Sequence, residues 1–268
     1  MLVSVFPLLF VAYYSFTDYY LLAKGGAQWV AGENYRKIIS DPYFRQALWN
    51  TLYFCLLAVV FETGLGLALA AVVNSLKRFA QTLRILLLLP MLVPGVTAAL
   101  TWQMMLSNNY GIINQILGVF GLPAANWLMD PAMALYAVLV VDIWQFTPFC
   151  FMLLYAAMQS VPAEQYEAAQ IDGAGGIKSF FYITLPNIGK VLSLVVLLRV
   201  IDSFRLFDKV NILTKGGPAN STATITQYIY QHGIKSLKIG YSSAATVIMT
   251  LLMLLVAAIY IRRSFKKE

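Results

Sequence analysis

The chain has 268 residues, of which 60% are hydrophobic and only 12% charged, and its mean hydropathy is +0.70. An average soluble domain is about 25% charged, so a water-soluble globule of this size could not cover its surface with so few charges. This excludes most soluble enzymes, nucleic-acid-binding proteins and disordered scaffolds. The net charge of +7 does not indicate a nucleic-acid partner, because the basic residues occur in runs of at most two beside apolar stretches, as at the ends of membrane spans.

The apolar residues gather in stretches long enough to cross a lipid bilayer, which takes about 20 residues as a helix. Only a few charged side chains fall inside these stretches: Glu62, Asp142, Lys190, Arg199, Asp202 and Arg205. The sequence therefore predicts an all-α membrane protein with about six transmembrane helices. The predicted spans are residues 1–16, 51–73, 85–106, 132–158, 188–207 and 244–261.

The chain divides into two parts in this interpretation. Residues 1–50 hold a first transmembrane helix, which looks trimmed at its N-terminus, followed by an outer segment whose residues 33–50 mix aromatic and charged side chains. That pattern is typical of an interfacial helix, although an ordinary amphipathic connector fits it equally. Residues 51–268 form the main transmembrane domain. Taken together, segments 74–84, 159–187 and 262–268 carry Lys and Arg at about twice the density of the other connections, which predicts that both termini are cytoplasmic.

The usual chemical groups of a membrane enzyme are missing from the sequence. Its one histidine, His232, lies in a predicted outer loop, and Cys55 and Cys150 lie in spans without CxxC spacing. There is no HExxH, GxSxG or GxxxxGK[ST] motif. We therefore expect no catalytic residues, no metal ligands and no cofactor bound by this chain. If ATP drives its function, a separate polypeptide must hydrolyse it.

The loop between the fourth and fifth spans, residues 159–187, is the most informative polar segment. Pro162 favours a helix start there, and Glu167 lies early enough to complement the helix dipole. The glycines around Gly173 must end this helix, and a second short amphipathic helix follows. Leu185-Pro186 is expected to turn the chain back to the membrane. This pattern favours a docking surface for a partner, and an ordinary loop lying on its own bundle is the alternative.

This loop resembles the EAA loop of permease subunits in binding-protein-dependent ABC importers. The resemblance rests on the segments Glu167-Ala168-Ala169, Asp172-Gly173-Ala174 and Ile183-Thr184-Leu185-Pro186. Further segments are similar to carbohydrate-type, MalF-like permeases: Asn34-Tyr35, Asp41-Pro42, Asn50-Thr51-Leu52, residues 198–208, residues 213–220, Tyr228-Ile229-Tyr230 and residues 240–244. The resemblance covers essentially the whole chain.

The resemblance implies the fold of a type I ABC importer permease, in which the EAA loop 159–187 forms coupling helices that seat on an ATPase subunit. By likeness, Glu167 pairs with a cation of the ATPase, the alanines allow close approach and Gly173 supplies the bend. The implied docking residues are Glu167, Ala168, Ala169, Asp172, Gly173, Ala174, Leu185 and Pro186. For Glu167 alone, a structural role as a helix-start charge is the alternative.

The resemblance also implies partners and a location. A second related permease subunit would complete a heterodimer, two ATPase subunits would hold ATP and Mg, and an extracytoplasmic solute-binding protein would deliver a carbohydrate. The place of action would be the bacterial inner membrane, in contact with its lipid.

A substrate pathway should be sought among polar groups inside the spans, because these are costly in lipid and usually face the interior of the bundle. Asp142 and Arg199 both lie near mid-span. Gln145 and Phe149 share a helical face with Asp142 at i+3 and i+7, and Ser203 shares one with Arg199 at i+4. Together they would offer a polyhydroxylated ligand a carboxylate, an amide, a guanidinium, a hydroxyl and an aromatic ring.

The same residues have a structural alternative. Arg199, Asp202 and Arg205 could simply neutralise one another, with Asp142 bonded across the bundle, and Glu62 is expected to make a structural bond between helices. A secondary active transporter for a small polar solute is the alternative function, and it would require broken helices in corresponding halves. The sequence leaves open whether a carbohydrate substrate is neutral, acidic or phosphorylated.

Overall fold

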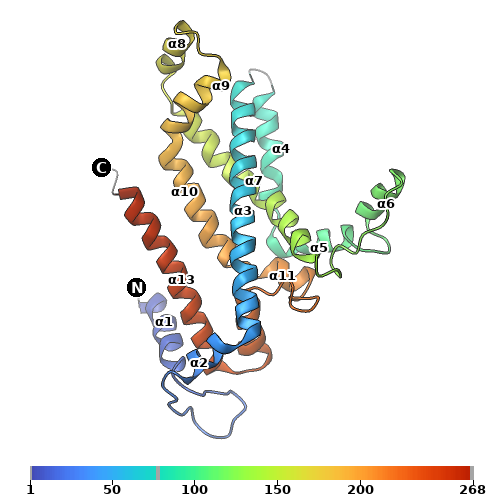
Figure 1. Cartoon of the computed structure of the whole chain (residues 1–268), viewed down its shortest axis with the longest axis vertical. Helices are drawn as coiled ribbons and strands as arrows, with labels where there is room; N and C mark the ends of the chain where they lie inside the picture. Colours follow the sequence, from blue (N-terminus) through green and yellow to red (C-terminus); the bar gives the residue numbers. More distant parts are fainter. Residues whose placement is uncertain (1, 77–78, 266–268) are drawn as a thin grey trace.

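The computed structural model describes residues 2–76 and 79–265, and these are almost entirely helical (Figure 1). Within these ranges there is no β-strand, only a single antiparallel bridge between Thr17 and Trp29. The predicted all-α class is therefore confirmed. Lys77, Arg78, Lys266 and Lys267, on which the predicted orientation partly depends, lie outside the described residues.

A central bundle is built from four helices: α3 (Pro42–Ser75), α4 (Ala80–Leu92), α7 (Ala134–Gln159) and α10 (Leu185–Phe204) (Figure 1). The most extensive packing is between α3 and α7. A Cβ atom added to Gly66 of α3 would lie 2.6 Å from the Cβ of Cys150 on α7, so only glycine permits this approach. Small residues at such crossings are typical of helices packing in membranes.

A second group of helices lies beside the lower end of this bundle in Figure 1. It contains α1 (Leu2–Tyr14), α2 (Glu33–Ser40), α12 (Ile225–Tyr230), the π-helix η2 (Gln231–Lys235) and the long α13 (Ile239–Phe265). Helix α6 (Ile112–Val119) projects away from the bundle on the other side. The α8–α9 hairpin lies at the opposite end from α2. The two ends of the bundle therefore carry different structures.

Four helical stretches of the described chain are long and apolar enough to span a membrane: Pro42–Ser75, Ala134–Gln159, Gly176–Leu213 and Ile239–Arg262. They contain the predicted spans at 51–73, 188–207 and 244–261, and all but the first two residues of the span at 132–158. The predicted first span is a shorter apolar helix, Val5–Tyr14 within α1. The count of six spans stays a prediction.

The predicted third span, 85–106, is not one straight helix. Helix α4 ends at Leu92 and α5 (Gly95–Met105) leaves it at an angle of 93°. The break falls at Val93-Pro94, because a proline disfavours helical geometry in the preceding residue, and Val93 is extended with ψ 125°. The pair is a broken span or a re-entrant loop.

The predicted interfacial segment 33–50 is likewise divided. Helix α2 ends at Ser40, and α3 already begins at Pro42 rather than at residue 51. Asp41 is extended because Pro42 follows it, and its carboxylate accepts a hydrogen bond of 2.9 Å from the backbone N–H of Tyr43. The Asp41-Pro42 pair thus acts as a helix start.

The loop 159–187 folds as the predicted helix–turn–helix, with α8 (Ala163–Ile171) and α9 (Gly176–Ser179) joined by a turn. The expected turn at Leu185-Pro186 is absent. Instead α9 passes through the π-helix η1 (Phe180–Thr184) directly into α10. Pro186 follows η1 by two residues, and Leu185 between them keeps helical φ and ψ of −61° and −42°, so the helix continues through the proline.

Candidate transport site

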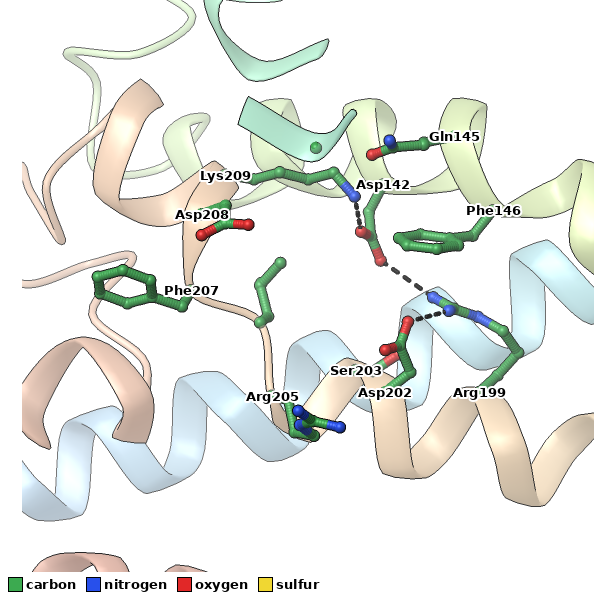
Figure 2. Close-up of a pocket in the computed structure, with 12 residues that line it drawn as sticks. Asp142, Gln145, Phe146, Arg199, Asp202, Ser203, Arg205, Phe207, Asp208 and Lys209 are labelled. Carbon is green, nitrogen blue, oxygen red and sulfur yellow. Dashed lines mark hydrogen bonds and ion pairs between the residues drawn. The ribbon is translucent and has the colours of Figure 1, made fainter. Parts of the chain in front are cut away.

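A cluster of buried ionic side chains joins the helices of the bundle near the middle of the predicted spans. The Arg199 guanidinium on α10 donates to Glu62 of α3 at 2.6 Å, to Asp202 at 2.5 Å and to Asp142 of α7 at 3.4 Å. Figure 2 shows Asp142 and Asp202 converging on Arg199 from two elements. Each nitrogen of the guanidinium therefore has a carboxylate partner.

Lys209, from the short helix α11 (Asp208–Leu213), completes this cluster by an ion pair with Asp142. The ring of Phe146 lies 4.0 Å from the Arg199 guanidinium carbon and 4.3 Å from the Lys209 ammonium nitrogen, so one aromatic face attracts both cations. The name ion cluster is used below for Glu62, Asp142, Arg199, Asp202 and Lys209.

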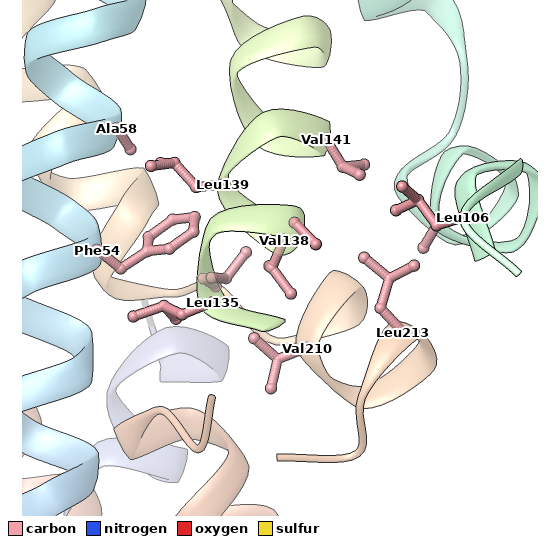
Figure 3. Close-up of a cluster of buried hydrophobic side chains, with 12 residues drawn as sticks. Phe54, Ala58, Leu106, Leu135, Val138, Leu139, Val141, Val210 and Leu213 are labelled. Carbon is pink, nitrogen blue, oxygen red and sulfur yellow. The ribbon is translucent and has the colours of Figure 1, made fainter. Parts of the chain in front are cut away.

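Helix α11 holds Lys209 in place because its other face belongs to the hydrophobic core. Val210 and Leu213 are buried against Val138 and Val141 of α7, with Leu106 nearby (Figure 3). This packing requires no polar partner, so α11 is fixed without using the charge of Lys209. The lysine side chain is consequently free to reach Asp142, and it is 4% exposed.

A cavity of about 270 Å³ opens beside the ion cluster, between α7, α10 and α11 (Figure 2). Two buried polar atoms in its lining have no hydrogen-bond partner: Oε1 of Gln145 and Oγ of Ser203. The Gln145 amide nitrogen donates to the Val93 carbonyl at 2.7 Å, which points its oxygen away from that bond. Buried polar groups normally have partners, so these two atoms are hydrogen-bonding groups that the protein leaves unused beside the cavity.

The structure brings together four of the five residues expected along a substrate pathway. Asp142, Gln145, Arg199 and Ser203 all line the cavity, whereas Phe149 lines a neighbouring groove together with Phe146. Two aromatic rings line the cavity, those of Phe146 and Phe207. Phe146 lies one helical turn from Asp142, whereas Phe149 lies two turns away, or about 10 Å.

The structural alternative is partly realised as well. Arg199 and Asp202 do neutralise each other, and Glu62 makes the expected bond between helices, but Arg205 is exposed. Sequence reasoning missed Lys209, because it follows the end of the predicted fifth span by two residues. Its position beside the other intramembrane charges was the only available signal.

The expected docking residues lie at the exposed end of the bundle. Glu167, Ala168, Asp172, Gly173 and Pro186 are exposed, and Ala169, Ala174 and Leu185 are partly buried. Several large apolar side chains beside them are also exposed: Ile171, Ile177, Phe181 and Tyr182.

Gly173 forms the bend between the two short helices with a positive φ of 77°. The Gly173 N–H donates to the Gln170 carbonyl at 3.1 Å, and the Ala174 N–H donates to the Ala169 carbonyl at 2.8 Å. These two bonds are those of the Schellman motif, which ends a helix at a residue of left-handed conformation. The segment Asp172-Gly173-Ala174 therefore has a defined structural function.

Helix α8 is attached to the beginning of α10 by side-chain hydrogen bonds. The hydroxyls of Tyr166 and Thr184 are 2.9 Å apart, and the Asn187 amide donates to the Gln165 side-chain oxygen at 2.8 Å. These bonds link the first helix of the hairpin to the chain that continues into α10.

Several of the segments that resembled carbohydrate-type permeases meet at the end of the bundle opposite the α8–α9 hairpin. The Asp41 carboxylate accepts hydrogen bonds from the hydroxyls of Tyr228 at 2.5 Å and Tyr241 at 3.3 Å, and the two hydroxyls are 2.7 Å apart. The name outer clamp is used below for Asp41, Tyr228 and Tyr241. Burial and the bond to Asp41 raise the pKa of Tyr228 above its ordinary value.

Other segments of that resemblance also have structural functions here. The Asn50 amide donates to the carbonyls of Asn220 and Ala223, both at 3.0 Å, and ties α3 to the loop before α12. A Cβ atom on Gly240 would lie 2.0 Å from the Thr17 carbonyl oxygen, so α13 approaches the chain after α1 only because this residue is glycine.

The bundle, the broken helix and the exposed hairpin define an importer-type transmembrane permease. The chain superposes with a TM-score of 0.83 on a bacterial ABC transporter involved in the import of the acidic polysaccharide alginate, with 23% identity over 89% of this chain and 84% of that one. The inward-facing MetNI methionine ABC transporter matches with a TM-score of 0.61 over 82% of this chain and 94% of that one, at 14% identity. Both similarities establish the fold.

Residues 62–265 match the family described as binding-protein-dependent transport system inner membrane component. The sulfoquinovosyl glycerol transport system permease SmoG of Agrobacterium fabrum is 33% identical over 97% of this chain and 85% of its own length. The trehalose/maltose permease MalF of Thermococcus litoralis is 35% identical over 85% of this chain and 77% of its own. The chain belongs to this family, and it is a transport subunit rather than an enzyme.

Proposed function

We propose that this chain is a permease subunit of an ATP-driven carbohydrate importer, and that the cavity beside the ion cluster is part of its translocation pathway. Asp142, Gln145, Arg199 and Ser203 would line the pathway, with Phe146 in the place expected for Phe149. Sugars require paired donors and acceptors together with an apolar ring face, and the cavity offers both. The relatives named for the transport of sulfoquinovosyl glycerol and of trehalose and maltose support the carbohydrate class.

The observation that carries this proposal is the helical continuity between the exposed hairpin and the cavity. From Leu185, α10 runs about 20 Å to Arg199, which lines the cavity. Because α8 is bonded to Thr184 and Asn187, a force applied to α8 would act on α10 directly. Rigid elements of this kind can transmit alternating access in a bistable bundle.

The force would come from a separate ATPase subunit that holds ATP and Mg. Glu167 is exposed and available for a cation of that partner, while Ala168, Ala169 and Ala174 present little bulk. The exposed apolar side chains around them would be covered on docking. Asp172, Gly173, Leu185 and Pro186 would shape this surface through the turn and the helix start.

The complete importer would hold a second related permease, two ATPase subunits and an extracytoplasmic solute-binding protein. In this arrangement the hairpin and both termini lie in the cytoplasm of a bacterial cell. The outer clamp lies on the opposite side of the inner membrane, where it faces the solute-binding protein. In Figure 1, α13 extends from the end that carries α2 toward the level of α8, which agrees with this orientation.

Two substitutions in the hairpin test the coupling, each measured by uptake into vesicles and by co-purification of the ATPase. Glu167→Lys reverses the proposed docking charge, and Gly173→Asp places a side chain at positive φ. Both should reduce ATPase association and uptake. Glu164→Lys, an exposed residue in the first turn of the same helix, is the matched control and should have less effect. Unchanged association and uptake in both variants would contradict the proposal.

A further inference from the structure

The charges around the cavity differ in how completely they are paired. We propose that the cavity accepts uncharged, hydroxyl-rich sugars and rejects anionic ones, and that Asp208 is the residue that discriminates between them. This inference rests on the proposed function, because it takes the cavity as part of the pathway. It concerns the substrate class, which the sequence left open and which differs among the relatives.

The two buried cations that line the cavity are already paired with carboxylates of the protein. Arg199 directs its guanidinium at Glu62, Asp142 and Asp202, and Lys209 is paired with Asp142. Phe146 covers both cations from one side. An anionic sugar would compete for them with Glu62 and Asp142, which are buried, and with Asp202, whose side chain is half-exposed. Displacing either buried carboxylate is costly. These cations therefore position carboxylates rather than recognise an anion.

The broken span would be the next place for an anion, and a carboxylate of the protein itself lies close to it. Helix α5 begins at Gly95, which lines the cavity, and the free N–H groups of a helix N-terminus attract negative charge. A methyl group placed on Gly95 would lie 3.6 Å from Oδ2 of Asp208, so the protein's own carboxylate lies against this helix end. Figure 2 shows Asp208 beside Lys209 at the cavity. An incoming carboxylate, sulfonate or phosphate would be repelled there.

The groups that remain available suit hydroxyls. Oε1 of Gln145 can accept a hydrogen bond, and Oγ of Ser203 can donate and accept, and neither has a protein partner. Asp202 has a side chain that is 49% exposed and offers further acceptor capacity. Arg205 is the exposed cation of the lining, and the exposed Asp208 of the same lining carries the opposite charge. The cavity thus has no surplus positive charge with which to hold an anion.

The test compares two sugars that differ in one group, methyl glucoside with a hydroxymethyl and methyl glucuronide with a carboxylate. Saturation-transfer NMR measures their binding to the complete permease–ATPase complex in lipid nanodiscs. The solute-binding protein is omitted, so that its selectivity does not enter. The wild-type complex should bind methyl glucoside at least about tenfold better than methyl glucuronide, since one like charge near the ligand costs that much or more.

Two charge variants give opposite expectations in the same cavity. Asp208→Asn should narrow the preference for the neutral sugar by about tenfold, and Arg205→Gln should widen it. Asp208→Ser serves as a second variant with a smaller side chain. Equal or better binding of the glucuronide by the wild type would overturn the inference, and so would an Asp208→Asn preference equal to that of the wild type.

A blocking experiment separates this inference from the proposed function. Asp202→Cys, modified after assembly with a bulky thiol reagent, should abolish binding of both sugars, while the native Cys55 and Cys150 are buried. Persistence of both signals after modification would overturn the proposed pathway and the inference together. Loss of both signals, combined with a wild-type preference for the glucuronide, would retain the pathway and overturn the neutral substrate class alone.

Discussion

The ion cluster and the outer clamp are both buried polar assemblies that join distant segments, but they are built differently. In the outer clamp one carboxylate accepts from two tyrosine hydroxyls, and the same aspartate also begins α3. In the ion cluster three carboxylates surround two cations beside a cavity that holds unpartnered polar atoms. The clamp is thus suited to fix a geometry, whereas the cluster borders a space where another molecule can bind.

The largest effect is expected when the cluster loses its central cation. Arg199→Met leaves Glu62 without its ion-pair partner and Asp142 with one partner fewer, and removing one member of a buried ion pair costs about 3–5 kcal/mol. The thermal midpoint of the detergent-solubilised complex should fall accordingly.

The double variant Glu62→Gln/Arg199→Met is the matched control for this loss. It removes the uncompensated carboxylate together with the cation, so it should recover a large part of the stability. A double variant that is as unstable as the single one would mean that the side-chain volume of Arg199 matters and its charge does not.

At the end of the bundle that carries the outer clamp, a steric overlap should destabilise the fold more than the loss of a charge. Gly240→Ala would place a methyl group 2.0 Å from the Thr17 carbonyl, and overpacking of this kind costs about 1–3 kcal/mol. Gly64→Ala is the matched control, because a Cβ atom there meets no other atom within 4 Å. Equal thermal midpoints for the two variants would contradict the close approach of α13 to the chain after α1.

Part of the ion cluster could be predicted from the sequence, and there is a physical reason why the rest could not. Asp142 and Arg199 stood out because charges are scarce in apolar stretches. Lys209 did not, since a lysine just beyond a span is ordinary, and only the folding of α11 against α7 brings it back to Asp142.

Turns and helix breaks were predicted from the sequence only in part. The glycines around Gly173 predicted the end of α8, because that signal is local. Pro94 broke the third predicted span at 93°, whereas Pro186 did not turn the chain. The residue before Pro186, Leu185, keeps helical φ and ψ, whereas the residue before Pro94, Val93, is extended. The convergence of Asp41, Tyr228 and Tyr241 depends on contacts across almost 200 residues, and no local pattern contains them.

A smaller loss of stability is expected when only the negative charge of the clamp is removed. Asp41→Asn keeps a side chain that begins a helix as well as aspartate does, so the cap of α3 survives. The two tyrosine hydroxyls lose a charged acceptor, at a cost of about 1.5–3 kcal/mol. Because the pKa of Tyr228 is raised, the wild-type clamp should stabilise fully below pH 10 and weaken as pH rises above it. A pH titration of the thermal midpoint of both proteins measures this difference.

The smallest expected change in stability separates the roles of the two assemblies most directly. It compares the loss of a hydroxyl from the clamp with the loss of a hydroxyl from the cavity. Tyr241→Phe removes a bonded hydroxyl from the clamp and should cost about 1 kcal/mol. Ser203→Ala removes a buried hydroxyl that has no partner, so it should leave stability unchanged or raise it by up to about 1 kcal/mol, while sugar binding weakens. Thermal midpoints and saturation-transfer signals of the two variants provide the comparison. A loss of stability in Ser203→Ala as large as in Tyr241→Phe would mean that the hydroxyl is bonded within the protein, and the cavity would then lose one of its two free contacts for a sugar.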